Sequence, residues 1–163
     1  MPTTTERKTG PDSSGTHVWL VMMRAYRALE NVAYNSIESS DSCLSDFAVM
    51  EMLLHKGPQP VNEIGRRIDL TSGAITTAVD RLESRGLVTR EAHDTDRRAR
   101  IVRLTPRGKE HAAKAFATHK AAMDSAANSL SKTERATLIR LLKKLGKSPE
   151  VQSAKAIASE RRN

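Results

Sequence analysis

The stretch that decides the fold runs from Pro60 to Thr105 and reads PVNEIGRRIDLTSGAITTAVDRLESRGLVTREAHDTDRRARIVRLT. Apolar spacing in Val61–Ile68 predicts a short helix, and after a tight turn Thr71 caps a longer one. Strand patterns follow at Leu87–Arg90 and Arg100–Leu104, the second of which alternates apolar and basic residues. Two helices joined by a short turn and followed by a hairpin predict a winged helix-turn-helix.

The start of the second helix carries short polar side chains that suit the floor of a DNA major groove. The missing side chain at Gly73 lets the helix end approach base edges, while hydroxyl and backbone N–H groups can bond phosphates. Helix capping on a solvated face is the alternative interpretation. We expect DNA contacts from Thr71, Ser72, Gly73, Thr76, Thr77 and Arg81, with Arg81 at phosphates or solvent rather than at bases.

The tip of the predicted hairpin is rich in arginine. A narrow minor groove concentrates negative potential and attracts an inserted arginine, and a nearby carboxylate can hold the guanidinium in one orientation. We therefore expect Arg97 and Arg98 to enter the minor groove, with Asp96 orienting Arg98. A solvent-exposed hairpin held by salt bridges is the alternative.

Bulk composition agrees with a polyanionic partner and excludes several other classes. The 163 residues carry a formal charge of +8, with a pI near 10.0, and their number suits one domain per subunit. No apolar run approaches the roughly 18 residues of a membrane span, and no secretory signal opens the sequence, so we expect a cytoplasmic protein without membrane contact. Because five histidines and one cysteine show no ligand spacing, and no catalytic motif is evident, we expect no metal, no cofactor and no enzymatic activity.

The flanking segments predict a mobile tail and long helices. Residues 1–15 are poor in apolar side chains, whereas residues 16–40 form a helix with two apolar stripes, one for the chain's own core and one for another subunit. Residues 105–147 hold an alanine-rich helix and a second helix opened by a capping box. Residues 148–163 form a tail or a short helix. The winged helix-turn-helix itself is assigned to residues 41–104.

Two further features invite a functional interpretation. Cys43 lies between the first two long helices, where it is a candidate oxidation switch, with an inert thiol as the alternative. Methionines and aromatic residues of the first two helices can line an adaptable apolar cavity, although core packing explains each of them individually.

Residues 44–108 resemble the MarR family of winged-helix bacterial transcription regulators, and with the flanking helices the similarity spans residues 16–146. The resemblance rests on seven segments: Phe47-Ala48-Val49-Met50, Ile64-Gly65, Ser72-Gly73-Ala74-Ile75-Thr76, Val79-Asp80-Arg81-Leu82-Glu83, Arg85-Gly86-Leu87-Val88, Asp94-Thr95-Asp96-Arg97-Arg98-Ala99 and Leu104-Thr105-Pro106-Arg107-Gly108.

The resemblance implies a fold that is mainly α with a small β-wing, in an obligate homodimer. The first, fifth and sixth helices intertwine, so residues 16–40 and 105–147 become the N- and C-terminal dimerisation helices. Two winged modules then read a pseudo-palindromic operator in double-stranded DNA, with half-sites about 34 Å apart. The resemblance also assigns Asp96 and Arg98 to the wing pair that enters the minor groove.

A finer resemblance links the segment from Ser72 to Thr76, after His55-Lys56-Gly57, to the subgroup that responds to catechols, quinones and related phenolics. Two positions depart from the family pattern. Gly65 stands where the family often has alanine, and Cys43 does not sit at the N-terminal position that the family's peroxide sensors use.

The leading hypothesis is therefore a repressor released by a small aromatic or phenolic effector, which favours a dimer shape that no longer matches DNA. Its alternatives are a thiol-based repressor using Cys43 and a winged-helix module that binds proteins instead of DNA. The expected effector pocket lies where the dimer helices meet the winged module and is lined by Trp19, Met23, Arg24, Tyr26, Arg27, Phe47, Met50 and His55.

Overall fold

The computed structural model describes residues 12–92 and 100–160, apart from the side chains of residues 155 and 158–160. The chain forms two compact units, Met1–Met123 and Asp124–Asn163, here called unit 1 and unit 2. Among the described residues, no helix combines the length and apolar character that a bilayer span requires.

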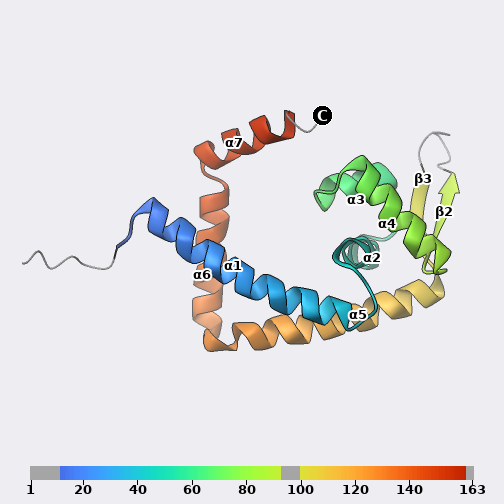
Figure 1. Cartoon of the computed structure of the whole chain (residues 1–163), viewed down its shortest axis with the longest axis horizontal. Helices are drawn as coiled ribbons and strands as arrows, with labels where there is room; N and C mark the ends of the chain where they lie inside the picture. Colours follow the sequence, from blue (N-terminus) through green and yellow to red (C-terminus); the bar gives the residue numbers. More distant parts are fainter. Residues whose placement is uncertain (1–11, 93–99, 161–163) are drawn as a thin grey trace, which may run out of the picture. The chain divides into compact units, whose positions relative to one another are not determined.

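Unit 1 contains a winged module made of three helices and a three-stranded antiparallel sheet (Figure 1). The sheet has the order β1-β3-β2, and β2 pairs with β3 so that Val88 faces Leu104 and Arg90 faces Val102. The fold class is therefore the predicted winged helix-turn-helix. Its elements are α2 (Leu44–Lys56), β1 (Gln59–Pro60), α3 (Val61–Arg67), α4 (Ser72–Ser84), β2 (Val88–Ala92) and β3 (Arg100–Leu104).

One apolar core holds this module together within a single chain. Its side chains come from one face of each helix and from the inner face of the strands, as the spacing of apolar residues in the sequence requires. Burying a large aliphatic side chain stabilises a fold by about 1.5–3 kcal/mol. The core comprises Val49, Met50, Leu53, Ile64, Ile75, Ala78, Val79, Leu82, Leu87, Val88, Val102 and Ala112.

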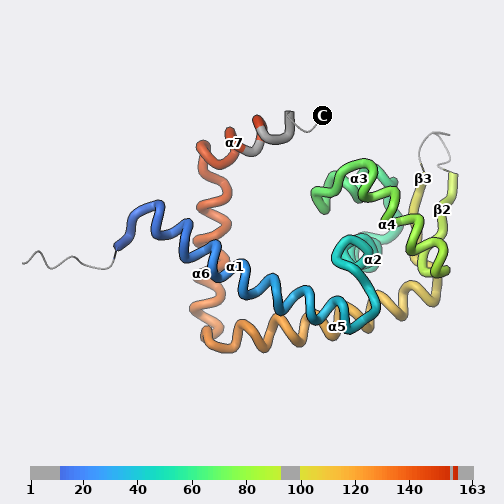
Figure 2. Tube along the Cα trace, viewed as in Figure 1, coloured from blue at the N-terminus to red at the C-terminus, as the bar shows by residue number. Residues whose placement is uncertain are grey.

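Two long helices accompany the module (Figure 2). They are α1 (Gly15–Glu38) in unit 1 and α5 (Pro106–Ala126), whose last three residues belong to unit 2. A smaller apolar cluster of Ile37, Phe47 and Ala115 joins α1, α2 and α5. The start of α5 approaches the wing so closely that a Cβ atom at Gly108 would lie 1.8 Å from the Leu87 carbonyl oxygen, so only glycine fits there.

Unit 2 consists of a 3-10 turn (Ala127–Ser129), α6 (Lys132–Gly146) and α7 (Pro149–Glu160). The predicted capping box of α6 is confirmed, because the Ser131 hydroxyl accepts from the Glu134 N–H and the Glu134 carboxylate accepts from the Ser131 N–H. The end of the chain, left open between a tail and a helix, is helical up to Glu160.

Two local features differ from what the sequence predicts. The first helix, expected over residues 16–40, begins at Gly15 and ends at Glu38, and the hydroxyl of Ser14 caps it by accepting from the His17 N–H. The short strand β1 was not expected, since two residues beside Pro58 carry no strand periodicity, and it exists because Gln59 and Pro60 pair with β3.

Candidate nucleic-acid interface

The turn between α3 and α4 fixes where α4 begins. Asp69 adopts a left-handed conformation with φ of 57°, and the Leu70 N–H donates to the Gly65 carbonyl at 2.9 Å. Gly65 itself is buried against Ile75, whose Cγ2 atom would lie 3.1 Å from an added Cβ. As predicted, Thr71 caps α4, with its hydroxyl accepting from the Ala74 N–H at 3.2 Å.

The two faces of α4 differ completely in burial. Ile75, Val79 and Leu82 point into the core, whereas Thr71, Ser72, Gly73, Thr76 and Thr77 are all exposed. A Cβ atom at Gly73 would meet nothing within 4 Å. The structure therefore gathers the five uncharged residues that were predicted to contact DNA onto one accessible surface, which we call the α4 face.

The hydroxyl groups of the α4 face are engaged with the helix backbone. Thr76 Oγ1 donates to the Ser72 carbonyl at 2.9 Å, and Thr77 Oγ1 donates to the Gly73 carbonyl at 3.0 Å. Threonines in helices often bond back to the preceding turn in this way. The bonds hold both side chains in one orientation.

Arg90 of β2 ties the wing to α4, a role that the sequence analysis missed. Its guanidinium lies 2.5 Å from the Asp80 carboxylate and 2.7 Å from that of Glu83, and it also donates to the Thr76 carbonyl. The side chain is only 22% exposed, so solvent screens these contacts less than it screens most surface pairs. In the sequence, the available signal for this role was the pair of acidic residues Asp80 and Glu83, which lie three positions apart on one face of the helix.

Arg81 has a partner inside the protein that the sequence did not reveal. Its guanidinium binds the carboxylate of Asp46 at 2.6 Å, and the Asp46 side chain is only 4% exposed. The same guanidinium donates to Ser45 Oγ at 3.0 Å and to Cys43 Sγ at 3.2 Å. The hydrogen bonds to Asp46 raise the pKa of Arg81. Arg81 thus fastens α4 to α2, while its side chain stays 44% exposed.

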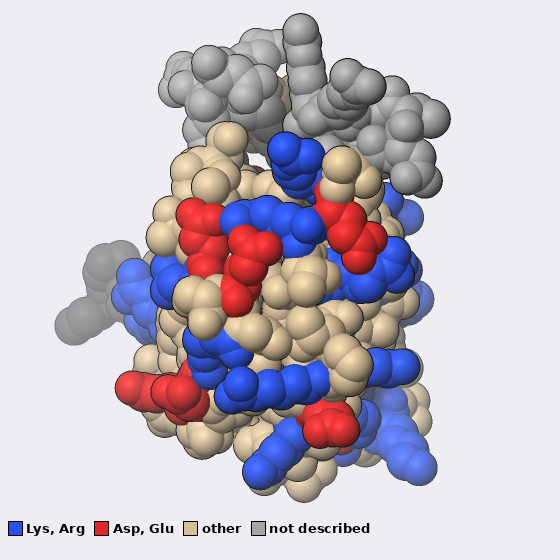
Figure 3. Space-filling view, turned by 90° about the vertical axis from the view of Figure 1, so that its right-hand side faces the viewer, with Lys and Arg blue, Asp and Glu red and all other residues tan. Residues whose placement is uncertain are grey.

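A second arginine of α4 behaves in the same way. The guanidinium of Arg85 lies 3.2 Å from the carboxylate of Asp41, which precedes α2. Figure 3 shows the general pattern on one face of the molecule, where Lys and Arg lie against Asp and Glu instead of forming a purely basic patch. Arg81 and Arg85 therefore form ion pairs that stabilise the fold, whether or not they also contact a partner.

The predicted wing tip, formed by Asp96, Arg97 and Arg98, falls within residues 93–99, outside the described part of the chain. The strands on either side are described, and Arg103 of β3 pairs with Glu91 of β2 at 3.3 Å. The two strands that flank the tip are paired as far as Ala92 and Arg100.

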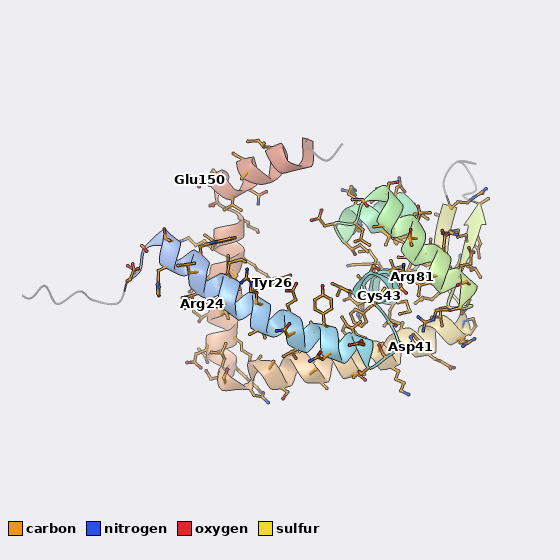
Figure 4. The ribbon with its side chains drawn as sticks, viewed as in Figure 1. Arg24, Tyr26, Asp41, Cys43, Arg81 and Glu150 are labelled. Atoms are coloured by element: carbon orange, nitrogen blue, oxygen red, sulfur yellow. The ribbon has the colours of Figure 1, made fainter. Side chains whose placement is uncertain are left out.

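The structure distributes the eight predicted effector-pocket residues over three different settings. On α1, Trp19, Arg24, Tyr26 and Arg27 are exposed and Met23 is half-buried. Met50 is fully buried in the core of the winged module and is unavailable to a ligand, because packing rather than pocket lining explains it. Figure 4 shows Arg24 and Tyr26 on a different part of the molecule from Cys43 and Arg81.

The remaining two pocket residues lie against α5. Phe47 packs on the His119 ring with a centroid distance of 4.9 Å, and His55 meets Phe116 edge-on at 4.7 Å. His119 Nδ1 is 2.9 Å from Ser36 Oγ, and that hydroxyl donates to the Ala33 carbonyl. Because this hydroxyl donates its only proton to Ala33, Ser36 can accept a hydrogen bond from His119 Nδ1.

A cavity of about 410 Å³ lies elsewhere, at the junction of α1 and α2. The Cys43 thiol lines it, but among the residues that the structure describes no group of three His, Cys, Asp or Glu could hold a metal ion. Sequence reasoning did not find this cavity, because its walls come from a turn whose shape depends on Asp41, with φ of 54°. The lining residues are Tyr34, Ile37, Glu38, Asp41, Ser42, Cys43 and Leu44.

Comparison with known proteins identifies the family. The sequence profile of the MarR family matches residues 44–99. The HTH-type transcriptional regulator MhqR of Bacillus subtilis is 36% identical over 129 residues, which cover 79% of this chain and 89% of MhqR. The chain belongs to the MarR family. It is accordingly a DNA-binding transcriptional regulator and not an enzyme.

Two solved structures show the same fold as this MarR-family regulator. A mutant of Escherichia coli MarR, solved with operator DNA, gives a TM-score of 0.70 at 22% identity, covering 78% of this chain and 92% of that one. Bordetella bronchiseptica BpsR, whose DNA binding is regulated by 6-hydroxynicotinic acid, gives a TM-score of 0.72 at 22% identity. The match covers 85% of this chain and 99% of BpsR.

Proposed function

We propose that this regulator is a repressor that binds a pseudo-palindromic operator as a homodimer and leaves it when a small aromatic effector binds. The observation that carries the DNA contact is the α4 face, which is polar, exposed and braced from behind by the core. In the proposal the α4 face enters the major groove, and the wing tip enters the neighbouring minor groove. The contacting residues are Thr71, Ser72, Gly73, Thr76 and Thr77, with Asp96, Arg97 and Arg98 at the tip.

Exposed apolar side chains support a dimer. In unit 1, α1 exposes Val18, Trp19, Val21 and Leu29. In unit 2, α6 separately exposes a row of large aliphatic residues, Leu138, Ile139, Leu141, Leu142 and Leu145. Patches of this kind mark interaction surfaces, because leaving apolar area in water costs about 25 cal/mol per Å². A second copy of the chain would cover both helices.

The contacts between α5 and the winged module support an effector mechanism. His119 and Phe116 of α5 touch Ser36, Phe47 and His55, so these rings are where the module meets the long helices. A flat aromatic ligand inserted beside them would move the module relative to α5. Such a ligand shifts the equilibrium between the DNA-bound and the released dimer shapes. The size of the shift equals the difference between its affinities for the two shapes.

The DNA contact is tested by fluorescence anisotropy with duplexes from the promoter of the regulator's own gene, at several salt concentrations. Thr77→Asp should weaken binding at least 100-fold, because it brings a carboxylate against phosphates and base acceptors. Ser153→Asp, at an exposed position of α7, is the matched control. Neutralising Z phosphates should give a salt slope of about −0.9Z. A flat salt dependence without a specific complex would instead favour a protein-binding module.

The effector part is tested separately by titrating catechol, 1,4-benzoquinone and 6-hydroxynicotinate into the complex of wild-type protein and operator. Release by one of them, with binding seen by calorimetry in the absence of DNA, would support the proposal. His55→Ala should weaken that response while leaving operator affinity within about twofold. If none of the three compounds binds or releases DNA, the aromatic effector class is wrong.

A second candidate mechanism, oxidation of Cys43, is favoured by one observation. Because Arg81 contacts both Cys43 and Asp46, an adduct on the sulfur would disturb the contacts that hold α4. Hydrogen peroxide should then release DNA from the wild-type protein but not from Cys43→Ser. An equal response of the two proteins would eliminate this mechanism.

A further inference from the structure

The charge distribution on α4 limits what the helix can recognise. Over its first two turns, the exposed side chains are Ser72, Thr76 and Thr77, and none of them is a cation. The nearest arginines, Arg81 and Arg90, are held by carboxylates of Asp46, Asp80 and Glu83. The usual partner of guanine, an arginine or lysine aimed at O6 and N7, is therefore missing from the α4 face.

The two threonines also lack a spare proton. Each hydroxyl donates its only hydrogen to a carbonyl one turn earlier, Thr76 to Ser72 and Thr77 to Gly73. What each side chain presents to a groove is then an oxygen that accepts and a methyl group. To donate to guanine, either hydroxyl would first have to give up its bond to the helix.

A·T pairs fit this surface better than G·C pairs. In the major groove, each pair displays one amino donor and two acceptors: adenine N6 with adenine N7 and thymine O4 in an A·T pair, and cytosine N4 with guanine N7 and O6 in a G·C pair. Only the A·T pair adds a methyl group, which a threonine methyl suits, and its adenine sets the amino donor beside N7, where an accepting oxygen can meet it. On guanine the two acceptors lie side by side, and neither Thr76 nor Thr77 has a free proton to offer them.

We propose that Thr76 and Thr77 make α4 a reader of A·T pairs in the major groove of each half-site. This inference rests on the proposed DNA-binding function and specifies the bases that the function uses. Gly73 would assist this contact, because its missing side chain leaves space for the helix to approach the DNA until the two threonines reach the base edges.

The test begins with selection of bound sequences from a random duplex library by the full-length protein. The expected result is half-sites that contain A·T pairs at positions where ethylation and methylation interference locate the major-groove contact. Replacing such a pair by inosine·cytosine keeps the minor groove of A·T but gives the major groove of G·C. This replacement should lower affinity by about tenfold at positions read by α4 and leave it unchanged at positions read only from the minor groove.

Matched variants separate the two chemical contacts. Thr76→Val keeps the methyl group and loses the oxygen, so it should become insensitive to replacing adenine by purine, which lacks the N6 amino group. Thr76→Ser keeps the oxygen and loses the methyl, so it should become insensitive to replacing thymine by uracil. In the wild-type complex, each of these base replacements should cost about three- to tenfold at the contacted pair. Thr77→Val and Thr77→Ser form the same pair of tests at the next residue. Ser153→Ala, which removes an exposed hydroxyl from α7, is the control.

Each outcome decides one point. G·C pairs at the contacted positions, or indifference to inosine·cytosine there, would overturn the A·T inference while leaving DNA binding intact. Failure to enrich any sequence would overturn the proposed DNA-binding function itself. Thermal unfolding of every variant within about 2 °C of wild type excludes loss of the fold as the cause.

Discussion

In the winged module, the side chains of Val49, Ile64 and Leu82 are fully buried within one chain, whereas Ile139 and Leu141 of α6 remain 52% and 48% exposed. No residue of α6 is buried. The module thus closes its own core, because helices and strands from distant parts of the sequence cover one another. In unit 2, α6 is an amphipathic helix with no buried residue, and the proposed dimer would give its apolar side chains a cover.

The largest effect should distinguish these two regions directly. Leu82→Ala removes a fully buried side chain and should lower the free energy of unfolding by about 2–5 kcal/mol. Leu142→Ala in α6 should instead raise the dissociation constant of the dimer. Urea unfolding measures the first effect and sedimentation velocity the second. Unchanged self-association in Leu142→Ala would show that this residue is not at a subunit interface.

An intermediate effect is expected where α4 meets α2. Asp46→Asn keeps the shape of the side chain but removes the charge that binds Arg81, and should cost about 1–2 kcal/mol. This cost is at the low end of what losing a hydrogen bond to a charged group usually costs, because the Arg81 side chain is 44% exposed and solvent screens its charge. Urea unfolding gives the cost, and Glu63→Gln, whose pair with Arg66 is more exposed, is the control and should change stability by under about 0.5 kcal/mol. Equal costs for both variants would contradict the structural role of Asp46.

A smaller effect is expected at the start of α6. Ser131→Ala removes the hydroxyl that accepts from the Glu134 N–H, which typically costs about 1 kcal/mol. Amide hydrogen exchange in the first turn of α6 should become faster, while exchange in α4 stays unchanged. Faster exchange in α4 as well would mean that the two units unfold together.

The smallest effect concerns pH. Burial lowers the pKa of His111 below its ordinary value of 6.5, with a further contribution from Arg85. The unfolded chain therefore takes up a proton at a higher pH than the folded protein does, so the free energy of unfolding should fall as pH drops below about 6.5. His111→Gln should flatten this part of the pH profile. An identical slope in the variant would assign the effect to another group.

The elements that sequence could predict are those with local signals. The core face of α4 follows from the spacing of Ile75, Val79 and Leu82, and its start follows from the cap at Thr71. The exposed α4 face is the remainder of the same helix, so its residues could be named as well. The strands of the wing were predictable because Arg100–Leu104 alternates apolar and basic side chains.

The features that the sequence did not reveal depended on distant partners. Arg81 was expected to contact phosphates or solvent, and the structure adds a partner inside the protein, Asp46, which is 35 residues away in sequence. Met50 looked available to a ligand, but it is fully buried in a core to which α3, α4 and the wing contribute as well as α2. Strand β1 is two residues long and is recognisable only by its pairing with β3.

By itself, then, the sequence determined the succession of helices and strands, the caps, and which side of each element faces inward, because those properties depend on residues within one or two turns of each other. Only the tertiary structure decided which arginines remain available to DNA and which are bound by carboxylates. An ion pair forms between side chains that the fold brings together, and the positions of Asp46 and Asp80 relative to Arg81 and Arg90 exist only once the helices and the wing have packed.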